Sequence, residues 1–419
     1  MRIRYICLCL WVLMMLTASA FGAEKVLTIG ISGTYTGGFA DVGKNVCDGM
    51  TDYLSYLTEH GGIAYKDPAT GKEERTALRI FIEDNQYNVA KAVIAYNKLK
   101  IRGVNAIIGF GSTPGEACAA FASQDRLPYL AWYSYASPAG YRPKPQYYWS
   151  FLPTIAESAT PMIKWFAKQK WQGEGKSKIG ILAAEVPSWK VLGKPGMMDS
   201  YMQSLGAEFA GVEFVPLGAT DLSAGIDRLL FQKKADCLIF IGTTAQTVIL
   251  AKNLRRMEVD TEKITVICSL SAWDESLFKS VPNEIEGLYG EVHAVSPHAN
   301  IPGMVRVKAI AKAAGHNPEA IVMNYINGFT GAFALETAIR RALEKHGYEK
   351  VAESGEAIQE ELNSFAPADP WGLAPVMETK HTDLPYFVNN ARIVRAKNSR
   401  FENAGEWVLI DRISGSVDF

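Results

Sequence analysis

The sequence predicts an α/β protein made of two successive units, each a doubly wound parallel sheet with helices on both faces. Short apolar runs of the strand type alternate with stretches of helical periodicity, and this alternation occurs twice along the chain. The composition is that of a globular protein, because 48% of the 419 residues are apolar and 21% are charged. This length is also sufficient for two or three domains.

The N-terminal segment, residues 1–23, is predicted to be a secretory signal peptide. Arg2 and Arg4 precede an apolar run over 6–16, and the small residues at 18–20 fit a cleavage site best placed after Ala20. The apolar run is too short to cross a hydrocarbon layer about 30 Å thick. We therefore expect an exported protein whose signal peptide is removed.

The first unit is predicted to contain four strands with helices between them. The strands are expected at 26–31, 78–82, 106–109 and 129–132. The helices are expected over 46–57 and 90–99, and from Ser112, where Pro114 suits a first helical turn. Strands joined in this way by helices run parallel and are covered on both faces.

A second unit of the same kind begins after Pro153. Its strands are predicted at 178–182, 212–215, 237–241 and 264–267. Its helices are predicted at 191–205, 222–233 and 247–257, followed by a last helical block over 322–346. Two segments rich in Pro, Gly and polar residues are candidate crossings between the units, 283–302 and 367–385.

The residue content excludes several classes of function. Lys and Arg number 43 against 44 Asp and Glu, and this balance argues against nucleic acid as a partner. The sequence contains no CxxC, no HExxH and no cluster of histidines, so we predict no metal and no cofactor. It contains no G-x-S-x-G nucleophile motif either, and we predict no catalytic residues and no enzyme activity.

Four cysteines follow the predicted signal peptide, namely Cys47, Cys118, Cys237 and Cys268. Each lies in a segment predicted to be helix or strand. Cys237 opens a strand and Cys268 closes one, so strand pairing would place them at opposite ends. We therefore expect four buried thiols, with a single disulfide as the alternative in an exported protein.

Two glycine-rich loops follow predicted strands. Residues 38–44 match G-x-x-x-x-G-K, but Asn45 stands where a phosphate loop has Ser or Thr, and an exported protein meets no nucleoside triphosphate supply. In the second loop Gly111, Ser112 and Thr113 lie at a strand-to-helix turn. Backbone N–H groups at a helix start and two hydroxyls together suit a carboxylate or another anion.

Taken together, the chain resembles the solute-binding proteins of ABC transporters with the type I periplasmic-binding fold, specifically the leucine/isoleucine/valine-binding group. The resemblance covers most of residues 24–419. It rests on short segments in a characteristic order and spacing: 29–37 with Ala40 and Gly43, 103–109 with Ser112-Thr113, Leu127-Pro128 with 136–138, and 372–376.

The resemblance implies two lobes joined by a hinge of three chain crossings. Lobe one would comprise 24–152 and 292–384, and lobe two 153–291 and 385–419. A small-molecule ligand would lie in the cleft at the carboxyl ends of both sheets. Hinge closure would bury it, and the permease subunits of an ABC importer in the membrane would recognise the closed form. The protein would be periplasmic, and we expect a monomer.

The resemblance also implies which residues contact the ligand. Lobe one would hold the ligand with Ser112 and Thr113 and with the loop Tyr133, Ser134, Tyr135 and Ala136. Tyr35 would contact it at the entrance, which Phe39 would also border. Lobe two would supply Trp189, the loop Thr243-Thr244, and the loop Ser269-Leu270-Ser271.

One position departs from the pattern of amino-acid binders in this family. Those proteins place an acidic side chain in the last lobe-two loop, where it pairs with the ligand's ammonium. Leu270 stands near that place here, and either Asp274 or Glu185 could substitute. Aromatic residues also crowd the predicted cleft: Tyr35, Trp132, Tyr133, Tyr135, Trp189 and Trp273.

These observations favour an apolar or aromatic carboxylate as the ligand of an importer's binding protein. Three alternatives stay open. The first is a branched-chain or other apolar amino acid as the ligand. The second is a ligand-sensing receptor domain of the same fold, and the third is an exported hydrolase.

Overall fold

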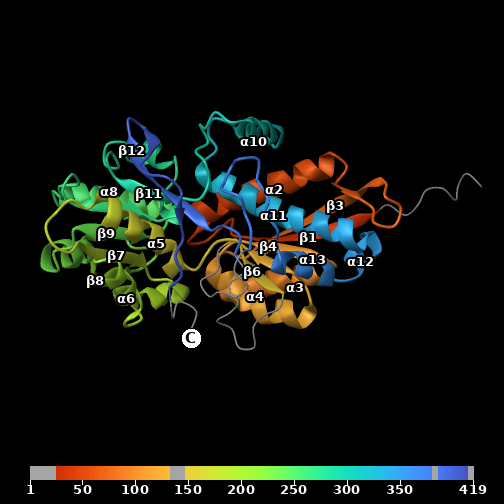
Figure 1. Cartoon of the computed structure of the whole chain (residues 1–419), viewed down its shortest axis with the longest axis horizontal. Helices are drawn as coiled ribbons and strands as arrows, with labels where there is room; N and C mark the ends of the chain where they lie inside the picture. The colour runs from red at the N-terminus through yellow and green to blue at the C-terminus, as the bar shows by residue number, and fades with distance from the viewer. Residues whose placement is uncertain (1–24, 133–146, 380–385, 414–419) are drawn as a thin grey trace, which may run out of the picture.

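The computed structural model describes residues 25–132, 147–379 and 386–413, so the predicted signal peptide lies outside it. The described residues form two lobes that lie side by side, each built on its own sheet (Figure 1). Helices cover both sheets, and the strands are mostly parallel, so the predicted fold class is confirmed. Among the described helices, none has the length and apolar content needed to cross a membrane.

The sheet of the first lobe has six strands in the order β2-β3-β1-β4-β5-β6. The central strands are parallel and β2 is antiparallel to β3. Their bounds are β1 Val26–Gly33, β2 Ile63–Lys66, β3 Glu73–Asp84, β4 Ala106–Gly109, β5 Tyr129–Ala131 and β6 Tyr148–Ser150. Every residue of β4, β5 and β6 is buried, as expected for strands covered on both faces.

The sheet of the second lobe follows the order β13-β12-β11-β10-β9-β7-β8, with β14 paired to β12. Strands β12 and β13 are antiparallel additions at one edge. The bounds are β7 Lys178–Ala184, β8 Glu208–Val215, β9 Cys237–Ile241, β10 Thr265–Cys268, β11 Tyr289–Val292, β12 Asn390–Lys397, β13 Arg400–Asn403 and β14 Val408–Leu409.

The helices of the first lobe are α2 Ala40–Glu59, α3 Val89–Ile101, α4 Ser112–Asp125, α10 Pro302–Ala313, α11 Met323–His346, α12 Tyr348–Glu353 and α13 Glu356–Asn363. Those of the second lobe are α5 Ile155–Trp165, α6 Met197–Ser204, α7 Ser223–Ile226, α8 Thr244–Arg256 and α9 Leu277–Ser280. The chain passes between the lobes after β6, again after β11, and a third time before β12. The exact lobe boundaries given above stay predictions.

Helices α2 and α11 cross at two glycines, and this contact holds the first lobe together. A Cβ atom on Gly49 would lie 2.0 Å from the carbonyl oxygen of Tyr325, and one on Gly328 would lie 1.9 Å from that of Val46. Each helix therefore presses its backbone against the other. Any side chain at either glycine would push the helices apart.

The structure differs from the sequence prediction in several elements. The helix predicted over 191–205 is wrong as a single element: a 3-10 helix covers Pro187–Gly193, and α6 starts only after Gly196. Pro195 lies between them and lacks the N–H that a continuous helix needs, while Gly196 has a positive φ of 80°. The prediction also missed β2, β6, β11 and β13.

The four cysteines are all in the described part of the chain, where each is buried and carries a free thiol. Cys237 opens β9 and Cys268 closes β10, as predicted. In the register of these parallel strands Cys268 lies opposite Phe240. The prediction of four buried thiols is confirmed.

Candidate functional site

The order of the strands in each sheet determines which loops lie at the crevice between the lobes. In the first sheet β1 lies between β3 and β4, and in the second β7 lies between β8 and β9. The helices that follow such neighbouring strands lie on opposite faces, which leaves a crevice at the carboxyl ends of the strands. The loops after β1, β4 and β7 therefore approach one another across the gap between the lobes.

A small cavity of about 20 Å³ lies at this point and is lined from both lobes. Its walls are Phe39, Tyr87, Phe110, Gly111, Ser112 and Trp132 from the first lobe, and Trp189 and Ser271 from the second. Larger hollows exist on the outside, such as one of about 450 Å³ between α2 and α10. That hollow lies away from the carboxyl ends of β1, β4 and β7, so the topology favours the small cavity as the site.

The first turn of α4 supplies the polar end of the cavity. Ser112 follows Gly111, which has a φ of 101° that residues with a side chain rarely adopt. A Cβ atom on Gly111 would also lie 2.8 Å from the ring of Tyr87. Glycine is needed here for both reasons, and it turns the start of α4 toward the cavity. The N–H groups of a helix start favour a negative charge.

Four hydroxyl groups meet at this helix start. The Ser188 hydroxyl, from the second lobe, lies 3.1 Å from that of Ser112 and 3.0 Å from that of Thr113. The Tyr87 hydroxyl lies 3.1 Å from Ser112 Oγ. Burial raises the pKa of Tyr87, so this phenol stays a neutral hydrogen-bond partner. The cluster offers several donors to an anion and carries no negative charge of its own.

A buried asparagine holds the surrounding loops in place. Asn85 donates from Nδ2 to the carbonyl oxygens of Ser32, at 3.0 Å, and Phe110, at 3.1 Å. Its Oδ1 accepts from the Tyr87 N–H at 2.9 Å and from the Thr34 hydroxyl at 2.6 Å. One side chain thus ties the ends of β1, β3 and β4 together beneath the cavity.

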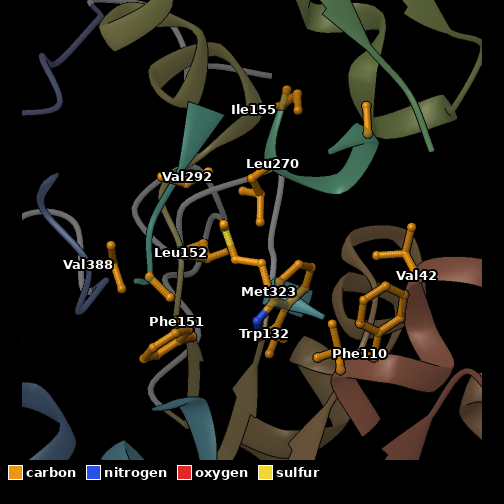
Figure 2. Packing of buried hydrophobic residues seen from close by; sticks show 14 of the residues in the cluster. Val42, Phe110, Trp132, Phe151, Leu152, Ile155, Leu270, Val292, Met323 and Val388 are labelled. Atoms are coloured by element: carbon orange, nitrogen blue, oxygen red, sulfur yellow. The ribbon is translucent and has the colours of Figure 1, made fainter. Parts of the chain in front are cut away.

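Aromatic rings form the apolar walls. Phe39 stacks on Tyr87 with ring centres 4.1 Å apart, and Phe110 stacks on Trp132 at 5.1 Å. Trp189, from the second lobe, meets the edge of Phe39 at 5.8 Å. Figure 2 shows Phe110 and Trp132 among the buried apolar side chains that surround this region. These rings offer flat apolar area on both sides of the gap between the lobes.

The indole N–H of Trp189 is a buried donor with no hydrogen-bond partner in the described structure. The side chain is only 2% exposed and lines the cavity. A buried donor without an acceptor is costly, by about 1–3 kcal/mol. An acceptor atom on a ligand would remove that cost.

No acidic side chain lines the cavity within the described residues, and the sequence of 133–146 contains neither Asp nor Glu. Asp274 is buried and accepts hydrogen bonds from Asn324 Nδ2, at 2.9 Å, and from the Thr244 hydroxyl, at 3.3 Å. Glu185 is about half exposed and pairs with Lys190 at 3.2 Å. Neither candidate for the ammonium partner lines the cavity.

Several of the predicted site residues have structural contacts outside the cavity lining. The Tyr35 hydroxyl lies 3.1 Å from that of Thr51, and Thr243 caps α8 by accepting from the Gln246 N–H. Leu270 is buried in the core, where Figure 2 shows it among other apolar side chains. Ser269 Oγ lies 3.4 Å from Ser271 Oγ, and Ser271 does line the cavity.

Four of the predicted site residues lie outside the described part of the chain, namely Tyr133, Ser134, Tyr135 and Ala136. Binding by these residues stays a prediction.

The structure brings Ser112, Thr113 and Trp189 together, and it adds three residues that sequence reasoning missed. These are Tyr87, Phe110 and Ser188. Tyr87 and Phe110 follow the ends of strands β3 and β4, which is where a parallel sheet places its site residues. Ser188 directly precedes the predicted Trp189. The sequence signal that could have identified these three residues is their position shortly after a predicted strand.

A comparison of the sequence with models of known protein families shows to which family the chain belongs. A family model described as a periplasmic binding protein matches residues 26–400. The chain belongs to the periplasmic binding protein family. The resemblance to ABC-transporter solute-binding proteins is thereby confirmed at the level of the family, and the chain is a solute-binding protein rather than an enzyme.

Solved structures of periplasmic binding proteins share the fold. A branched chain amino acid ABC transporter from Thermus thermophilus with bound valine gives a TM-score of 0.77 at 18% identity, covering 94% of this chain and 98% of that one. A solute binding protein from Rhodopseudomonas palustris BisB5 in complex with 3,4-dihydroxy benzoic acid gives 0.72 at 18%, covering 94% and 99%.

A fatty acid substrate-binding protein from Thermomonospora curvata gives a TM-score of 0.71 at 19% identity, covering 94% of each chain. These three relatives differ in the ligands named for them while their similarity to this periplasmic binding protein is almost equal. Identity this low supports the fold and leaves the ligand to the site itself. No curated protein sequence matches the chain significantly.

Proposed function

We propose that this periplasmic binding protein captures a small apolar or aromatic carboxylate between its lobes and delivers it to the permease subunits of an ABC importer. The observation that carries the proposal is the cavity itself: hydroxyls at a helix start, walls of aromatic rings and no acid among the described residues that line it. A carboxylate would accept from Ser112, Thr113 and Ser188. The apolar body would lie among the rings.

The absence of an acid from the described lining argues against an amino acid, because a buried ammonium needs an opposite charge. The relative that holds 3,4-dihydroxy benzoic acid supports an aromatic ligand for this fold, and the relative that holds valine supports the alternative. The unpaired Trp189 N–H further favours a ligand with a second hydrogen-bond acceptor.

The lobes must separate to admit such a ligand. A cavity of about 20 Å³ has room for roughly one water molecule, and a benzoate is several times larger. Ser188 and Trp189 lie on the lobe-two side, so movement of that lobe would enlarge the space. We expect the protein to act as an exported monomer that binds while open and closes around its ligand.

A thermal-shift screen tests the ligand class directly. The protein is heated with a panel of aromatic carboxylates and with a panel of aliphatic amino acids. A ligand at 100 times its Kd adds about 2.7 kcal/mol to stability, enough for a shift of a few degrees. We expect aromatic acids to raise Tm and leucine or valine to leave it unchanged. A shift with leucine alone would mean that another group pairs with the ammonium and would overturn the proposal.

Replacing Ser188 by alanine should weaken binding of the same acid about five- to tenfold, because the carboxylate loses one hydroxyl donor worth about 1–1.5 kcal/mol. Calorimetric titration measures this change. Ser204→Ala is the control, because Ser204 is exposed and bonds only to its own helix turn at Tyr201. Unchanged affinity in Ser188→Ala would show that the carboxylate does not reach the lobe-two side.

A further inference from the structure

Each lobe places a carboxylate on the first turn of a helix in the other lobe. Asp41, at the start of α2, accepts a hydrogen bond from the Ala245 N–H of α8 at 2.8 Å. In the opposite direction, Glu275 Oε2 accepts from the Met323 N–H at the start of α11, also at 2.8 Å. A carboxylate at a helix start is favourable, and both contacts join one lobe to the other in this closed arrangement.

Asp274 strengthens the second contact. Its Oδ2 accepts from Asn324 Nδ2 at 2.9 Å, and Asn324 belongs to α11 of the first lobe. Its Oδ1 accepts from the backbone N–H and the hydroxyl of Ser276, at 2.9 and 2.5 Å. Two adjacent carboxyl groups of lobe two therefore meet the same helix start, one through the backbone and one through a buried amide.

The cluster around these carboxyl groups is short of hydrogen-bond donors. Glu275 Oε1 and Asn324 Oδ1 are both buried acceptors without a partner among the described residues. Among the described residues, Asn324 Nδ2, the Ser276 N–H and the Met323 N–H are donors already bonded to Asp274 or to Glu275 Oε2. A proton on Glu275 would turn one unpaired acceptor into a donor and would also remove a negative charge beside Asp274.

We propose that closing the lobes takes up one proton at Glu275, so that closure of the cleft depends on pH. The inference rests on the proposed function only in treating lobe closure as the step that captures the ligand. The geometry behind it is the contact from Glu275 to α11 and the two unpaired acceptors beside Asp274.

The electrostatic environment of Glu275 in the closed form also favours its protonation. Burial and, after it, the charge of Asp274 together raise the pKa of Glu275 to about 8, against the hydrogen bonds from the backbone N–H groups of Met323 and Glu275 itself, which lower it. A solvated glutamate has a pKa of about 4.3. Because the pKa is raised in the closed form, protonation stabilises that form. This stabilisation is complete below about pH 4.3 and is lost as the pH rises through about 8.

Other charged groups share the hollow of about 190 Å³ that Glu275 borders, namely Lys279, His298, Glu319 and Arg400. Arg400 is paired with Glu402 at 2.8 Å, and Glu319 with Lys308 at 2.9 Å. His298 is the histidine that borders this hollow. A test must therefore separate Glu275 from His298.

Small-angle X-ray scattering of the full chain without added ligand gives this test. The radius of gyration is measured from about pH 5 to about pH 9 for the wild type and for Glu275→Gln. Glutamine keeps an acceptor for the Met323 N–H and supplies the missing donor without a charge. We expect the wild type to expand as the pH rises, with the closure constant falling by up to tenfold per pH unit below about pH 8.

The Glu275→Gln variant should stay compact across the whole range. Glu284→Gln is the matched control: Glu284 is an acid of the same lobe that pairs with Arg255 on the surface, so its variant should follow the wild type. Expansion of Glu275→Gln with the wild-type midpoint would assign the transition to another group and overturn the inference, as would a wild type of constant size. No ligand enters the measurement, so its failure is distinct from failure of the proposed ligand class.

Discussion

Replacing Ser112 and Thr113 together by alanine should weaken binding of the carboxylate ligand by about 2 kcal/mol or more, roughly 30-fold. Each hydroxyl donor to the carboxylate is worth about 1–1.5 kcal/mol, as for Ser188, and the double variant removes two of them at once. The backbone N–H groups of α4 remain, so some affinity should persist. Isothermal titration with the acid that gives the largest thermal shift measures the change.

The control for this variant lies on the same helix. Ser123 is near the end of α4, and its hydroxyl donates to the Ala119 carbonyl oxygen at 3.2 Å. Ser123→Ala should bind like the wild type. Equal affinity of Ser112→Ala/Thr113→Ala and the wild type would place the ligand elsewhere, provided that both proteins have the same Tm.

Replacing Gly328 by alanine should destabilise the protein by about 3 kcal/mol. The new Cβ atom would lie 1.9 Å from the Val46 carbonyl oxygen, which belongs to the backbone of α2 and has no rotamer to change. The two helices must separate, and the core between them loses contacts. Urea unfolding followed by circular dichroism should show a lower midpoint.

Gly331→Ala is the matched control, because Gly331 lies in the same helix and its Cβ would have ordinary contacts, the nearest at 3.7 Å. Alanine is about 1 kcal/mol better than glycine inside a helix, so this variant should be as stable as the wild type or more stable. Similar effects of the two substitutions would show that helix propensity, rather than the crossing with α2, sets the result.

Most buried parallel strands could be predicted from the sequence because they form uninterrupted apolar runs. The exceptions are β6, which has only three residues, and β11, which contains Gly290 and Glu291; both were missed although every residue in them is buried. Residues such as Ile107 and Ile239 lie in uninterrupted apolar runs, and the structure buries both completely. Edge strands were missed, since β2 and β13 are partly exposed and mix polar with apolar residues. Their pairing is decided by neighbours distant in sequence, which local patterns do not contain.

The site could be predicted where a residue lies directly after a central strand. Ser112 and Thr113 follow β4, and the first turn of a helix is recognisable from Pro114. Ser188 was missed because its role depends on a contact with a residue 76 positions away in the other lobe. Asp274 was considered as an ammonium partner, but burial of its carboxylate against Asn324 depends on how the lobes meet, which the sequence does not encode locally.

The crossing of α2 and α11 has a consequence for the kinetics of capture. Asp41 lies in the first turn of α2 and Asn324 in the first turn of α11. The close backbone contacts at Gly49 and at Gly328 fix the distance between these two anchor points. Because α2 and α11 move as one rigid pair, the first lobe cannot turn away at one of these contacts while the other stays formed. The lobes should therefore have no long-lived half-closed form. The time course of ligand capture should therefore fit a single exponential, because each molecule is either open or closed. A less rigid pair of helices would allow partly closed intermediates and a more complex time course.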